Sequence, residues 1–266
     1  IVKVPVIGQS DEIHKNEAAG DAFGEYRTHI TLGYQQYKQA FNEWQGTRKP
    51  ILFVMTENAQ KANEIAQALN TLDQWPGDEE PNLLKGRVLN LHTRLKGKIK
   101  TRKVGKQTFQ EFVYSEAASG ISDDDLKEIR KWSQQLDAED SPYRCVVSVL
   151  MLREGWDVRN VTTIVPLRPY SAKSNILAEQ TLGRGLRRMT RPGETLERVT
   201  VVEHPAFSRF YQEELAQEGL DVIIEPIEKV KPQSVTIFVD FKNRAVEELE
   251  IELPLVSNSI EATATL

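Results

Sequence analysis

The residues with the clearest potential for chemistry lie between positions 180 and 187. Gln180, Gly183, Arg184 and Arg187 are spaced by three or four, so on a helix they share one stripe of the surface. A guanidinium binds phosphate through parallel hydrogen bonds, and a glycine permits close approach of a ligand. The spacing therefore predicts a site for a phosphate whose charge builds during transfer. The alternative is the basic solvent face of an amphipathic helix.

A second polar stretch follows an apolar run at 145–149. Ser148 lies in this run, and the chain continues into the loop Leu152-Arg153-Glu154-Gly155-Trp156-Asp157. Ligands of parallel sheets bind at the carboxyl ends of strands, which is where this loop would lie. The pattern favours a ligand-binding loop, with an ordinary polar connection as the alternative.

Basic charge is concentrated in residues 85–106, which contain six lysines and three arginines and no Asp or Glu. The whole chain has a net charge of −5, so any attraction to nucleic acid must be local. The block predicts sequence-neutral contacts to phosphates through Lys98, Lys100, Arg102 and Lys103. A solvated, lysine-rich hairpin is the equally weighted alternative.

The elements around these residues alternate between strand and helix patterns. Continuous apolar runs predict buried strands at 51–55, 88–92, 145–149, 161–165 and 199–202. Helical patterns cover 31–45, about 58–69 after a cap at Thr56 or Asn58, the residues after Ser122, about 175–188 and about 206–218. This alternation predicts an α/β fold with a mostly parallel sheet covered by helices. We expect a lead-in strand and helix at 1–48, the α/β domain at 49–230, and a short β extension at 231–266, with strands at 234–241 and 249–255.

Composition narrows the class of protein further. With 266 residues, 39% hydrophobic and 27% charged, the chain is ordinary for a globular protein. Its single cysteine, Cys145, excludes an intramolecular disulfide, and its four histidines are too scattered to predict a metal site. No apolar run approaches the length of a membrane helix. We expect a cytoplasmic protein that does not enter membranes.

Together, the stretches resemble the second, C-terminal RecA-like motor lobe of superfamily 2 helicases. Gln180-x-x-Gly183-Arg184-x-x-Arg187 resembles motif VI, the loop at 152–157 resembles motif V, and 51–56 falls where motif IV lies. The stretch at 145–188 is most similar to the motor (Res) subunit of type III restriction enzymes, and its Leu-Arg-Glu-Gly loop also occurs in an excision-repair helicase. The resemblance is strong over 49–193 and looser to about 227.

The resemblance implies ATP in a cleft between two lobes, with Mg²⁺ and the phosphates held mainly by the first. Arg187 would be the arginine finger, Arg184 its partner at the γ-phosphate, and Gln180 the residue that positions the attacking water. The nucleotide-facing residues would be Gly155, Asp157, Gly183 and Glu154, and those meeting the nucleic-acid backbone Ser148, Arg153 and Thr56.

A first lobe is not recognisable in this sequence. The phosphate-binding pattern G-x-x-x-x-G-K-[ST] is absent, so we expect the chain alone to hydrolyse ATP poorly. Asp11-Glu12-Ile13-His14 has the letters of the Mg²⁺-binding DExH motif but follows polar residues instead of a buried strand, which favours coincidence. The chain opens at Ile1 in a β-like run, which predicts a piece of a longer protein.

Three classes of function compete. The first is half of an ATP-driven DNA motor, from a restriction system or from a repair helicase, partnered by duplex DNA, by the first lobe of the same chain, and by a methyltransferase or recognition subunit. The second is a nucleic-acid-binding module on a degenerate motor fold, favoured if the motif VI arginines are dispensable. The third is a nuclease using Asp240-Phe241-Lys242, which lacks the paired carboxylate that Mg²⁺ needs. The ordered motifs favour the motor.

Overall fold

The computed structural model describes residues 3–9, 15–91, 97–104, 107–114, 121–149, 158–167, 186–191, 195–202 and 223–226. The chain divides into two units, 1–231 and 232–266, and all described residues lie in the first. None of the helices among these residues is long and apolar enough to cross a membrane.

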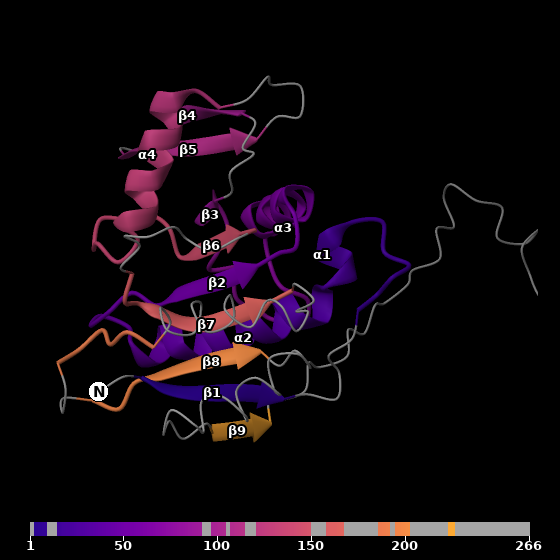
Figure 1. The fold of residues 1–266 in the computed structure, drawn as a ribbon, viewed down its shortest axis with the longest axis vertical. Helices are drawn as coiled ribbons and strands as arrows, with labels where there is room; N and C mark the ends of the chain where they lie inside the picture. The colour runs from indigo at the N-terminus through magenta and orange to yellow at the C-terminus, as the bar shows by residue number, and fades with distance from the viewer. Residues whose placement is uncertain are drawn as a thin grey trace, which may run out of the picture. The chain divides into compact units, whose positions relative to one another are not determined.

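The first unit is built on a seven-stranded sheet (Figure 1). Its strands are β1 (Val4–Gln9), β2 (Ile51–Met55), β3 (Val88–Leu91), β6 (Cys145–Ser148), β7 (Val161–Pro166), β8 (Arg198–Val202) and β9 (Ile223–Pro226). They are ordered β3-β6-β2-β7-β8-β1-β9, and every neighbouring pair is parallel. The predicted α/β fold with a parallel sheet is confirmed, as are the five strands predicted from apolar runs.

Four helices are described: α1 (Ala22–Glu25), α2 (Arg27–Glu43), α3 (Ala59–Thr71) and α4 (Asp123–Gln134). The α3 helix begins after Asn58, whose Oδ1 accepts a hydrogen bond from the backbone N–H of Lys61 at 2.9 Å. The Ser122 hydroxyl likewise caps α4 by accepting from the backbone N–H of Asp125 at 3.1 Å. These caps confirm Ser122 as a helix start and select Asn58 over Thr56.

Apolar side chains cover both faces of the sheet. On one face, α2 packs on β2, β7 and β8, while α3 packs on β3 and β6. The core there includes Leu52, Val54, Ile65 and Leu69. The opposite face holds Ile51, Phe53, Leu89 and Ile164, together with Ile129 of α4. Burial on both faces explains why the strands read as continuous apolar runs.

The described strand and helices before residue 49 belong to this sheet and to the layer that covers it. β1 pairs with β8 on one side and β9 on the other, and α2 covers the middle strands. A separate antiparallel hairpin consists of β4 (Gly97–Val104) and β5 (Gln107–Tyr114). The sequence did not predict β5, β9 or α1. The helix predicted at 206–218 and the strands predicted at 234–241 and 249–255 lie outside the described residues.

Candidate nucleotide and nucleic-acid interface

The carboxyl edge of the sheet brings together Thr56 and Ser148. The backbone N–H of Thr56 donates to the carbonyl oxygen of Ser148 at 2.8 Å, and the Thr56 hydroxyl lies 3.3 Å from the carbonyl oxygen of Asn58. Both side chains are only 1% exposed. In this conformation they join the ends of β2 and β6 and are covered, so they support the edge instead of presenting hydroxyls to a ligand.

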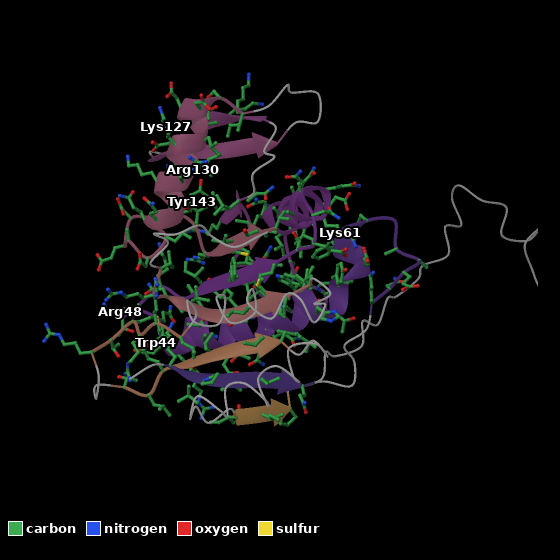
Figure 2. The ribbon with its side chains drawn as sticks, viewed as in Figure 1. Trp44, Arg48, Lys61, Lys127, Arg130 and Tyr143 are labelled. Atoms are coloured by element: carbon green, nitrogen blue, oxygen red, sulfur yellow. The ribbon has the colours of Figure 1, made fainter. Side chains whose placement is uncertain are left out.

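An ion-pair network also lies beyond the carboxyl end of β2. Glu57 accepts hydrogen bonds from the Tyr26 hydroxyl at 2.6 Å and from Lys61 Nζ at 2.5 Å. Lys61, labelled in Figure 2, also pairs with Glu25 at 2.8 Å, which pairs in turn with Lys15 at 2.7 Å. Two carboxylates face two ammonium groups, so the network is neutral and offers no net attraction for a polyanion.

The amino edge of the sheet joins the two segments expected to face the nucleotide. Lys3 Nζ donates to the carbonyl oxygens of Arg159 at 2.5 Å and Val161 at 2.6 Å. The backbone N–H of Lys3 donates to the carbonyl oxygen of Leu186 at 2.9 Å. Residues 158–161 directly follow the predicted motif V loop, and Leu186 directly precedes Arg187. The start of β1 therefore links the end of the motif V loop to the end of motif VI.

Burial of Lys3 has an electrostatic consequence at this junction. Burial lowers the pKa of the Lys3 ammonium to about 7, although the carboxylate of Glu197 opposes this shift. Lys3 is only 1% exposed, and a buried ammonium group is costly unless it has hydrogen-bond acceptors. The two carbonyl oxygens provide those acceptors. Lys3 is thus a structural crosslink between two loop ends.

Only part of the predicted site can be placed. Gln180, Gly183, Arg184, Arg153, Glu154, Gly155 and Asp157 lie outside the described residues. Arg187 is described and partly buried, but Leu186 lies in a turn and Arg187 and Arg188 are not helical. The prediction that the helix continues to Arg188 is wrong at its end, so Arg187 does not extend the helical stripe. Arg187 also lies at the opposite edge of the sheet from Thr56 and Ser148.

The basic block contributes one strand of a hairpin, β4, and the second strand, β5, lies beyond the block. Lys98 and Lys100 flank Ile99 along β4 and so occupy the opposite face. Ile99 packs against the core, and its backbone N–H lies 3.4 Å from Asp125 Oδ2 of α4. Lys98 and Lys100 are exposed. Two of the four predicted phosphate contacts therefore lie on the face away from the core, while the side chains of Arg102 and Lys103 lie outside the described part of the structure.

The opposite strand places other residue types in register with these positions. Lys98 pairs with Val113, Lys100 with Glu111 and Arg102 with Phe109. The sequence of β4 alone does not show this pairing.

Similarity to known proteins is limited to solved structures. No family model matches the sequence, and no curated protein matches it. The chain is similar to the C-terminal domain of a variant of S. cerevisiae Dbp5 bound to Gle1 and IP6, with 11% identity, a TM-score of 0.42, and coverage of 86% of this chain and 92% of that one. It is also similar to domain 2 of the DEAD-box helicase Mss116p bound to an RNA duplex, with 12% identity, a TM-score of 0.43, and coverage of 86% and 65%. Both TM-scores lie below 0.5.

Sequence reasoning missed two charged residues near Arg187. Lys3 lies in an apolar run that predicts a strand, and Glu197 immediately precedes β8; both are buried. A single charge beside a strand is ordinarily solvated, so neither position carried a sequence signal. Among the described residues, no group of three His, Cys, Asp or Glu side chains could hold a metal ion.

Proposed function

We propose that this chain is the second motor lobe of an ATP-dependent DNA helicase or translocase in a type III restriction-like system. In this proposal the RecA-like lobe supplies Arg187 and Arg184 to ATP and Mg²⁺ held mainly by a first lobe of the same protein. Gln180 positions the attacking water, while Gly155, Asp157, Gly183 and Glu154 face the nucleotide. The protein acts in the cytoplasm with a methyltransferase or recognition subunit.

The link through Lys3 is the observation that carries the proposal. The motor mechanism needs motif V and motif VI to face one nucleotide, although 22 residues lie between Asp157 and Gln180 in the sequence. Lys3 bonds both to the carbonyls of Arg159 and Val161, after motif V, and to that of Leu186, beside Arg187. The link supports the proposal because it holds the chain after motif V and the chain beside Arg187 at the same end of the sheet.

In this proposal, nucleic acid contacts surfaces of the lobe other than those that face the nucleotide. Arg153 follows β6 in the sequence, and the buried Thr56 and Ser148 support the carboxyl edge of the sheet at the ends of β2 and β6. Lys98, Lys100, Arg102 and Lys103 on β4 of the hairpin add basic positions suited to phosphate contacts that do not depend on sequence. Nucleotide and DNA thus meet different parts of the lobe, as expected if hydrolysis drives movement.

The test compares this 266-residue chain with a protein that also carries the first lobe. The chain alone is expected to bind DNA with strong salt dependence but to show negligible ATP turnover, because it has no phosphate-binding loop. Joining the first lobe should produce DNA-stimulated hydrolysis. Robust DNA-stimulated hydrolysis by the chain alone, after contaminating ATPases are removed, would contradict the proposal. DNA binding by the two-lobe protein without hydrolysis would favour a nucleic-acid-binding module.

A further inference from the structure

A buried carboxylate holds the backbone immediately after Arg187. Glu197 is 1% exposed, and its Oε2 accepts a hydrogen bond from the backbone N–H of Met189 at 2.7 Å. Its Oε1 accepts from the backbone N–H of Thr190 at 2.9 Å and from the Thr190 hydroxyl at 2.6 Å. One side chain thus binds three donors within two consecutive residues.

Further contacts attach the same segment to the sheet. Arg188 Nε lies 3.3 Å from Glu197 Oε1, and the Arg188 guanidinium donates to the Thr190 hydroxyl and to the carbonyl oxygen of Thr195. The backbone N–H of Val4 donates to the carbonyl oxygen of Glu197 at 2.8 Å. Glu197 itself is therefore fixed between the first residues of β1 and β8.

These bonds determine the charge of Glu197. Burial alone would raise the pKa of this carboxyl, but the hydrogen bonds from Thr190 and Met189 outweigh it and hold the pKa below its usual value. The side chain is therefore ionised at neutral pH, and an ionised buried carboxylate binds N–H donors strongly. Residues 187–190 are not helical, so these bonds replace the helical ones that would otherwise order this backbone.

We propose that Glu197 is the positioning residue for Arg187. By fixing the backbone of Met189 and Thr190, it sets the direction from which the Arg187 guanidinium approaches the transferring phosphoryl group. Misplacement of a group by about 1 Å can cost about 100-fold in rate, so an anchor two residues away matters to turnover. The catalytic part of this inference rests on the proposed function, whereas the anchoring does not.

The anchoring is tested on the 266-residue chain by amide hydrogen exchange. Glu197→Gln keeps the size of the side chain but replaces one acceptor oxygen with an NH₂ group and removes the charge. The amides of Met189 and Thr190 should exchange at least about tenfold faster, while those of β2 stay unchanged. Glu225→Gln, which removes the exposed partner of Arg198, is the matched control and should leave Met189 and Thr190 unchanged.

Two results would overturn the anchoring: unchanged exchange at Met189 and Thr190, or equally faster exchange throughout the chain. If Glu197→Gln does not fold, Thr190→Val removes only the hydroxyl donor. It should then accelerate exchange at residues 188–190 alone, and unchanged exchange there would also overturn the anchoring.

The positioning role is tested by ATP turnover in the protein that carries both lobes. Glu197→Gln should lower kcat by about 10- to 100-fold with little change in the KM for ATP or in DNA affinity. Added to Arg187→Ala, it should cause no further loss, because both changes remove the same contribution. A further loss in the double variant, or normal kcat in Glu197→Gln, would overturn the positioning role. If Arg187→Ala itself keeps normal turnover, the proposed function fails, and the exchange result still decides the anchoring.

Discussion

Replacing Gly33 with alanine tests how closely α2 packs on the sheet. The amino and carboxyl edges of this sheet hold the described residues of the predicted site. A Cβ atom built on Gly33 lies 2.1 Å from Val165 Cγ2 and 3.6 Å from Val202 Cγ2. Val165 is fully buried in β7, and its branched side chain has little freedom to rotate away. Something must therefore shift, and the shift involves the centre of the sheet.

Two effects oppose each other in Gly33→Ala. Alanine is more favourable than glycine inside a helix by about 1 kcal/mol, whereas overpacking a core costs about 1–3 kcal/mol. A contact at 2.1 Å lies far inside van der Waals distance, so we expect the upper end of that cost. The net loss of unfolding free energy should be about 1–2 kcal/mol, which corresponds to a fall in Tm of several degrees.

Urea unfolding of four variants measures this loss. Gly20→Ala is the control, because no atom lies within 4 Å of a Cβ built there, and it should be nearly neutral. Val165→Ala alone should destabilise by opening a cavity, but in its presence Gly33→Ala should become neutral or stabilising, since the clashing methyl group is gone. If the Gly33→Ala single variant, which keeps Val165, is as stable as the wild type or more stable, the close approach of α2 to β7 is refuted.

Two further predictions concern charge. Replacing Lys98, Lys100 and Arg102 together with glutamine should flatten the salt dependence of DNA binding by up to about 0.9 log units per lost duplex contact, measured by titration at several salt concentrations. The equal charge loss from replacing Lys127, Arg130 and Lys131, which are exposed on α4, should have little effect. If the α4 replacements flattened the salt dependence equally, the hairpin would contribute no more than any other basic surface. Burial lowers the pKa of Lys3 to about 7 and that of Lys49 to about 8, so between pH 7.5 and 8.5 the unfolded chain binds more protons and unfolding free energy should rise with pH. Lys3→Met should reduce that slope by about 1 kcal/mol per pH unit in urea unfolding, and an unchanged slope would show that Lys3 does not titrate there.

The sequence predicted the elements whose signals are local. Residues 51–55 and 161–165 are apolar at almost every position because parallel strands in the middle of a sheet are buried on both faces. Asn58 and Ser122 marked helix starts because their side chains satisfy free backbone N–H groups. These signals need no knowledge of distant residues.

The features that the sequence missed depend on contacts between distant segments. β1 pairs with β8, almost 200 residues away in sequence. β9 has only four residues, and Glu225 and Pro226 follow its two isoleucines, so its apolar stretch is too short to mark a strand. Burial of Lys3 depends on the carbonyl oxygens of Arg159 and Val161, which accept hydrogen bonds from its Nζ. Nothing near Lys3 in the sequence indicates those acceptors. The predicted helix was extended too far, to Arg188, because Arg187 fitted the three-to-four spacing, whereas residues 186–188 are not helical.

The turnover of Arg187→Ala in the two-lobe protein tests the central claim most directly. An arginine supplied to the transferring phosphoryl group acts when charge builds there, so kcat for DNA-stimulated ATP hydrolysis should fall by about 10³- to 10⁵-fold, equivalent to about 4–7 kcal/mol. ATP and DNA affinities should be nearly unchanged, Arg187→Lys should restore little because an ammonium lacks the planar fork, and the exposed control Arg130→Ala should behave like the wild type. Near-normal turnover of Arg187→Ala would contradict the motor mechanism, and a nucleic-acid-binding module would then explain the chain better.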